Sequence, residues 1–155
     1  MTTNTELQQF LNGLIPTDWF LAPVAVHFDD DEILVVGSVA ADRSVDEIRE
    51  ATRLDRMAIA DQVEAHFGRK VSWGVSQGDV TSLFTTYSPP ITTRLRLSER
   101  SVLDTLVSAG VARSRSDALG WCVKLVASHE AEWLAELRSA LVDVERIRDG
   151  GPSTK

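Results

Sequence analysis

Cysteine is nearly absent from this sequence of 155 residues, in which Cys122 is the single example. A lone thiol excludes an intrachain disulfide and a cysteine-based zinc site. Cys122 lies in a helical apolar pattern, so we expect it to be a small core residue. The three histidines, His27, His66 and His129, show no metal-ligand spacing. We therefore expect no bound metal and no cofactor.

Long apolar runs are missing as well. No stretch approaches the roughly 20 apolar residues that span a bilayer as a helix. The opening letters MTTNTELQQF have neither the basic start nor the apolar segment of a signal peptide. Apolar residues still make up 43% of the chain, which is enough to form a core. The sequence predicts a soluble cytoplasmic protein with no membrane partner.

Catalytic motifs are absent too. VVGSVA lacks the glycine spacing of a phosphate-binding loop, and SWGVSQGD is not a nucleophile elbow. The acidic run DDDE at 29–32 fits a hairpin turn better than a cation site. We therefore expect no catalytic residues and no enzymatic activity.

Charge is unevenly distributed around the net value of −7. Residues 1–90 carry 6 Lys or Arg and 14 Asp or Glu, whereas residues 91–124 carry 6 against 3. Such a contrast can mark segments with different partners. Chance in a small protein explains it equally well, so the contrast needs support from a motif.

Residues 1–87 are predicted to form a small α+β domain. Ser44 followed by Glu47 fits a capping box, and Gly68 suits a helix stop. The prolines of SPP fit neither a helix nor a strand ladder, so a linker is expected at 88–90. Apolar spacing predicts a helix at 5–15, hairpin strands at 22–28 and 32–40, a helix at 42–68 broken near Arg53, and strands at 70–75 and 80–87.

The pattern changes after the linker, and we expect a second domain at 91–149. ITTRLRL predicts a strand, and a helix follows from a cap at Ser98 to a stop at Gly110. Ser114 and Asp117 resemble a capping box that begins a second helix. Apolar spacing extends this helix to about residue 148, either straight or with a kink near ASHEAE. The tail at 150–155 is expected to be disordered.

The predicted strand at 91–97 has no evident partner in its own chain. An isolated strand is unstable, and its backbone amides and carbonyls need acceptors and donors. A second copy of the chain supplies both most simply, as an antiparallel two-stranded ribbon across a two-fold axis. Side-chain alternation would direct one set of residues toward the helices, Thr93, Leu95 and Leu97, and the other set outward, Thr92, Arg94 and Arg96.

The run TRLRLSERSVLDTLVSAGVARSRSDALGWCVKLV resembles the ribbon-helix-helix family of bacterial and archaeal DNA-binding proteins. RLS corresponds to the basic residue, apolar residue and helix-opening residue of that family, with Ser98 where proline is often found. RSRSDAL is similar to the opening of the family's second helix. The resemblance covers about 91–130, roughly a quarter of the chain.

The resemblance implies an obligate homodimer that inserts its ribbon into the major groove of double-stranded DNA. Three alternating strand residues would read base edges, here Thr92, Arg94 and Arg96. The start of the second helix would hold a backbone phosphate, here through Arg113, Ser114, Arg115 and Ser116. Two features differ from most members: about 90 residues precede the strand, and the second helix continues past the usual end.

Other interpretations stay open for these arginines. Arg94 and Arg96 could form a solvated face or guard a sheet edge. Arg49, Arg53 and Arg56 lie at helical spacing, but their acidic neighbours favour a solvated face over a second basic site. Trp73 and Trp121 are expected to be core or interface residues.

The main hypothesis is a bacterial transcriptional regulator such as a repressor, associated with the nucleoid. Its N-terminal domain would sense a small ligand, bind a protein or hold dimers together as a higher oligomer on DNA. The alternative is an antitoxin-like or adaptor protein that dimerises through the same segment and binds a protein partner. A weaker third hypothesis, an enzyme, would require a deep polar pocket in residues 1–87.

Overall fold

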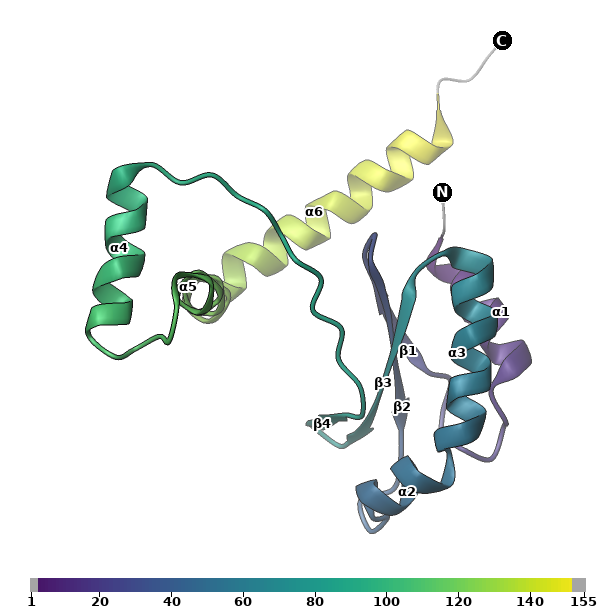
Figure 1. Ribbon diagram of the computed structural model, residues 1–155. Coiled ribbons are helices and arrows are strands. Elements are labelled where there is room, and N and C mark those ends of the chain that lie inside the picture. Colours follow the sequence, from purple (N-terminus) through teal and green to yellow (C-terminus); the bar gives the residue numbers. More distant parts are fainter. Residues whose placement is uncertain (1–2, 152–155) are drawn as a thin grey trace. The chain divides into compact units, whose positions relative to one another are not determined.

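The computed structural model describes residues 3–151, and within them the chain forms six helices and one four-stranded sheet (Figure 1). The predicted α+β class is confirmed. The chain separates into two compact units between Ile91 and Thr92, just after the proposed linker at 88–90.

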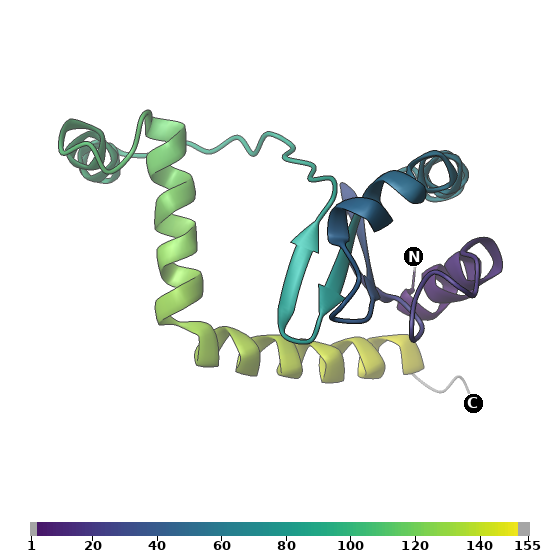
Figure 2. The ribbon, with the colours of Figure 1, turned by 90° about the horizontal axis from the view of Figure 1, so that it is seen from below.

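The N-terminal unit is a sheet with helices on one side, as Figures 1 and 2 show. Its elements are α1 (Asn4–Leu14), β1 (Ala25–Phe28), β2 (Glu32–Ser38), α2 (Val45–Ala51), α3 (Arg53–Phe67), β3 (Lys70–Gln77) and β4 (Val80–Leu83). The strand order is β1-β2-β3-β4, in which both sequence-adjacent hairpins are antiparallel and β2 pairs with β3 in parallel. The parallel pair requires a crossover, and α2 and α3 supply it.

The core of this unit lies between the helices and the sheet. Apolar residues four apart on α1 and α3 meet alternate residues of the central strands. Phe20 lies against Gly37 of β2, where any Cβ would overlap the phenyl ring, so the close approach requires glycine. The most deeply buried side chains are Leu7, Leu11, Ile33, Val35, Val63 and Val75.

Local signals place the helix ends. The Ser44 hydroxyl accepts a hydrogen bond from the Glu47 amide at 3.3 Å, which confirms the cap. Gly68 ends α3 with a left-handed φ of 69°, and the predicted break falls at Thr52. Between the two hairpins these signals define two short helices in place of one long one.

The expected solvated arginine stripe is wrong for Arg56, which is only 6% exposed. Arg56 lies on the same face of α3 as the buried Ile59 and Val63, so its side chain points inward. Its Nε donates to Thr52 Oγ1 at 3.0 Å, and its Nη2 donates to the Arg49 carbonyl at 2.9 Å. The guanidinium carbon lies 4.7 Å from the centroid of the Phe84 ring. Arg56 therefore links α2 to α3 through hydrogen bonds. Burial of the guanidinium lowers the pKa of Arg56.

The C-terminal unit is helical and consists of α4 (Leu97–Ser108), α5 (Arg115–His129) and α6 (Ala131–Gly150). The helix that was expected to continue to about 148 bends at Glu130, inside ASHEAE, and Figure 2 shows the turn between α5 and α6. Gly150, the first residue of the predicted tail, is helical, and residues 152–155 of that tail lie outside the described residues.

The strand predicted at 91–97 is absent from the single chain. Residues 91–96 have no regular structure, because a strand requires a hydrogen-bonded neighbour. Helix α4 begins at Leu97, so the prediction that Ser98 caps this helix is also wrong. Arg96 occupies the cap position, and its backbone amide donates to Glu99 Oε2 at 2.6 Å.

The two units differ in how much core they possess, and this predicts different folding behaviour for their fragments. The N-terminal core contains thirteen buried residues, whereas the C-terminal core contains three. A fragment of residues 1–87 should melt at a temperature independent of its concentration. A fragment of 88–155 should melt at a temperature that rises with concentration, because only association completes its core. Calorimetry over a hundredfold concentration range tests this, and a concentration-independent melt of 88–155 would contradict it.

Candidate nucleic-acid interface

The three proposed base-reading residues, Thr92, Arg94 and Arg96, are exposed on the segment that precedes α4. Leu95 between the arginines is partly buried against the C-terminal core, so the predicted alternation holds over 94–96. Thr93 and Leu97 were expected to face inward, but both are exposed, Leu97 by 75%. Within residues 3–151, no strand pairs with this segment to cover them.

Two hydrogen bonds fix the backbone of this segment against α4. Arg100 Nη1 donates to the Leu95 carbonyl at 2.5 Å, and the Arg96 amide is bound by Glu99. Within residues 3–151, neither Arg94 nor Arg96 makes a side-chain ion pair. Neither guanidinium group is therefore held by a carboxylate of this range.

The start of α5 has the capping arrangement that the sequence predicted. Ser114 Oγ accepts from the Asp117 amide at 3.1 Å, and Asp117 Oδ2 accepts from the Arg113 amide at 2.9 Å. The latter bond is the main reason that the pKa of Asp117 is lowered. The amides of Arg115 and Ser116 precede the first hydrogen bond within the helix, so they remain available to an anion.

Both arginines beside this helix start have acidic neighbours. Arg115 forms a bidentate ion pair with Asp104 of α4, in which Nε donates to Oδ1 at 2.7 Å and Nη2 donates to Oδ2 at 2.8 Å. Arg113 Nε lies 3.7 Å from Asp117 Oδ2. Asp104 lies eleven residues before Arg115, so no local spacing in the sequence could have identified it as the partner.

The two proposed sets of DNA-binding residues lie at opposite ends of α4. Thr92, Arg94 and Arg96 precede its first residue, and residues 113–116 follow the turn after its last residue (Figure 1). That turn contains Gly110, whose φ of 75° favours glycine. A single chain does not bring the two sets together.

Much apolar surface of the C-terminal unit is exposed. The 20 residues of α6 include none that is buried. A folded domain rarely leaves so many large apolar side chains in water on neighbouring helices without a partner. The exposed large apolar residues are Leu97, Val102, Val111, Trp121, Val123, Leu125, Val126, Trp133, Leu137, Leu141, Val142, Val144 and Ile147.

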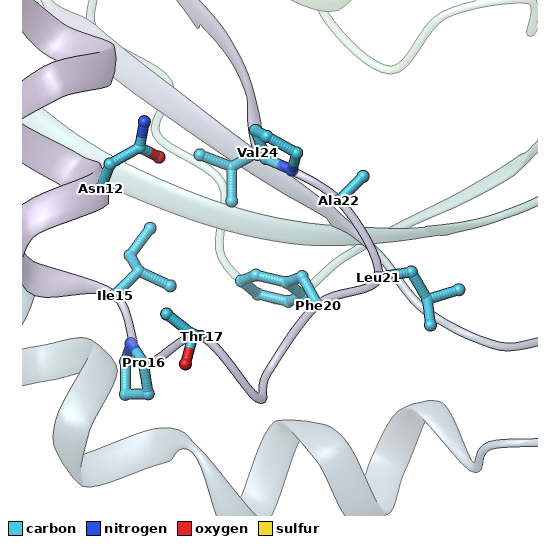
Figure 3. Close-up of a pocket in the computed structure, with 9 residues that line it drawn as sticks. Asn12, Ile15, Pro16, Thr17, Phe20, Leu21, Ala22 and Val24 are labelled. Carbon is cyan, nitrogen blue, oxygen red and sulfur yellow. The ribbon is translucent and has the colours of Figure 1, made fainter.

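The N-terminal unit has an open pocket of about 340 Å³ between the end of α1 and the loop that leads to β1. Figure 3 shows the Phe20 ring between Ile15 and Leu21 in this lining. Asn12 and Thr17 are the polar side chains among the lining residues, and no charged side chain belongs to that lining. The lining of this pocket is therefore mostly apolar.

No three His, Cys, Asp or Glu side chains of residues 3–151 gather in a way that could hold a metal ion. None of the helices in this range combines the length and apolar character needed to cross a membrane.

Comparison with known proteins identifies the family. Residues 5–83 match the family described as Rv1265-like protein, N-terminal domain, and residues 96–148 match the Mb1296 C-terminal domain family. The chain belongs to the Rv1265-like family. Two relatives are the uncharacterized protein Rv1265 of Mycobacterium tuberculosis (strain H37Rv) and the uncharacterized protein Mb1296 of Mycobacterium bovis. Each is 47% identical to this chain, and the alignment covers 93% of this chain and 69% of the relative. No solved structure matched the chain.

Proposed function

We propose that this protein is a dimeric, sequence-specific DNA-binding transcriptional regulator that acts on the nucleoid in the cytoplasm. Residues 91–96 of two copies would pair as an antiparallel ribbon and enter the major groove. One observation carries the proposal: two arginines without an ion-pair partner flank a half-buried leucine on a segment without regular structure, directly before two helices with a small apolar core.

Dimerisation would resolve two deficits of the single chain at once. Pairing the two segments gives their backbone amides and carbonyls partners. It also brings a second set of helices to the exposed apolar faces of α4 and α5, and burial of such surface drives association. The two-fold axis then doubles the outward arginines to four.

The charges divide into two roles on DNA. Arg94 and Arg96 can each donate a bidentate pair of hydrogen bonds to guanine O6 and N7, and Thr92 can contact a neighbouring base. Residues 113–116 would hold a phosphate through two free amides and charged side chains, which orients the dimer without reading sequence. The acidic N-terminal unit would be repelled by phosphates and would lie away from them.

The test is selection of bound fragments from genomic DNA with the full-length protein. We expect enrichment of a short inverted repeat, since a two-fold symmetric dimer contacts two equivalent half-sites. An unrelated duplex of the same length is the competitor control. If no sequence is enriched after washing at moderate salt, the proposed function is wrong.

A second function is favoured by α6, whose apolar residues are all at least partly exposed. Trp133, Leu137, Leu141 and Val144 recur at helical spacing, which is typical of a helix that packs against another surface. An adaptor or antitoxin-like protein would use this face to bind a protein partner. Truncation after Glu130 should then abolish partner binding while DNA binding, if present, persists.

A further inference from the structure

The ion pair between α4 and α5 has a definite geometry. Asp104 offers both carboxylate oxygens to the Nε and Nη2 of Arg115 at 2.7 and 2.8 Å. Leu103 and Ala118, both buried, pack α4 against α5 and so hold the two side chains opposite each other. The Arg115 side chain lowers the pKa of Asp104, and Arg100 acts in the same direction.

This arrangement occupies the groups that a phosphate would use. A guanidinium fork binds a carboxylate and a phosphate in the same two-pronged manner. Arg115 also begins α5, where its amide and that of Ser116 are free for an anion. In the single chain the carboxylate of Asp104 already binds the guanidinium of Arg115. A phosphate at these amides must therefore displace this carboxylate before it can bind the Arg115 side chain.

We propose that Asp104 competes with the DNA phosphate backbone for Arg115 and thereby limits the sequence-independent part of the DNA affinity. The inference rests on the proposed function, and it adds a residue that the family resemblance does not assign. Asp104 faces no base in this proposal, so it alters the affinity for all duplexes alike.

A purely structural role for the pair is disfavoured by its exposure. The side chains of Arg115 and Asp104 are 59% and 51% exposed, and ion pairs this open to water add little net stability. A positioning role is the physical rival, in which Asp104 holds Arg115 in the orientation that DNA needs. The two roles predict opposite signs when the carboxylate is removed.

The experiment uses fluorescence anisotropy to measure the binding of the full-length Asp104→Asn protein to a random duplex at several salt concentrations. Release of Arg115 in both copies should tighten binding at least about threefold at low salt. The slope of log affinity against log salt should steepen by about 0.9 for each additional phosphate contact. The ratio of specific to random affinity should remain that of the parent.

Two controls separate the mechanism from a simple change of net charge. Asp143→Asn also removes one carboxylate from an exposed ion pair, with Arg146 on α6 at 3.2 Å, and should leave binding unchanged. Arg115→Gln combined with Asp104→Asn should cancel the gain, because the released arginine is then missing. Asp104→Ser serves as a second variant if the asparagine protein does not fold.

The outcomes distinguish this inference from the proposed function. Tighter binding that disappears with Arg115→Gln supports it. Unchanged or weaker binding of the Asp104 variants, a gain that persists without Arg115, or an equal gain in Asp143→Asn overturns it while the parent still binds DNA. If the parent protein binds no duplex at all, the proposed function fails and this inference fails with it.

Discussion

Replacing Arg94 and Arg96 together by alanine is expected to abolish discrimination between the operator and random DNA while the protein remains folded and dimeric. Each bidentate contact between an arginine and a guanine contributes about 1–3 kcal/mol of discrimination. A dimer would lose four such contacts, so the specific affinity should fall by about 4 kcal/mol or more, roughly a thousandfold. Both side chains are exposed and unpaired in the single chain, so their removal should cost little stability.

The measurement is a titration of each variant against the selected operator and a random duplex at several salt concentrations. A matched control replaces Arg138 and Arg146 of α6, which removes the same charge from a segment outside the proposed interface. Arg113→Ala should weaken binding to every sequence alike and flatten the salt dependence, because phosphates carry no sequence information. If the Arg94/Arg96 variant binds its operator as well as the parent does, the ribbon does not read DNA and the adaptor hypothesis leads.

Features encoded by neighbouring residues were predictable from the sequence. Ser44, Ser114 and Gly68 mark helix ends through hydrogen bonds or backbone angles that involve only the next few residues. The strands of the two hairpins follow from apolar alternation in the same way. The α+β class was therefore accessible without any knowledge of contacts between distant residues.

Features that depend on distant residues were not predictable. The burial of Arg56 depends on Phe84, and the pairing of Arg115 depends on Asp104, eleven residues earlier. Neither contact leaves a spacing that a single sequence reveals. The segment at 91–96 does not form the predicted strand for a different reason. A strand needs a neighbouring strand to hydrogen-bond with, and in the proposed dimer that neighbour comes from the second copy.

The apolar face of α5 offers a test of whether a second copy of the chain packs against this unit. Leu125 is 40% exposed and lies one helical turn from Cys122, which packs against the small core. In a monomer a charge at Leu125 would lie in water, so Leu125→Glu should be nearly neutral. In a dimer the same carboxylate would be buried without a partner, and an unpaired buried charge costs about 3–5 kcal/mol.

We therefore expect Leu125→Glu to dissociate the dimer and to unfold the C-terminal unit, because three buried residues are too small a core to hold α4 and α5 together. Two copies carry the substitution, so the cost applies twice in each dimer. Lys124→Glu is the matched control, since it places the same carboxylate on the same helix next to Leu125 but replaces a charge that is already solvated. Sedimentation equilibrium and thermal melting measure both variants at micromolar concentration. A Leu125→Glu protein that sediments and melts like the parent would mean that this face has no partner copy, and the two-stranded ribbon would then lose its physical basis.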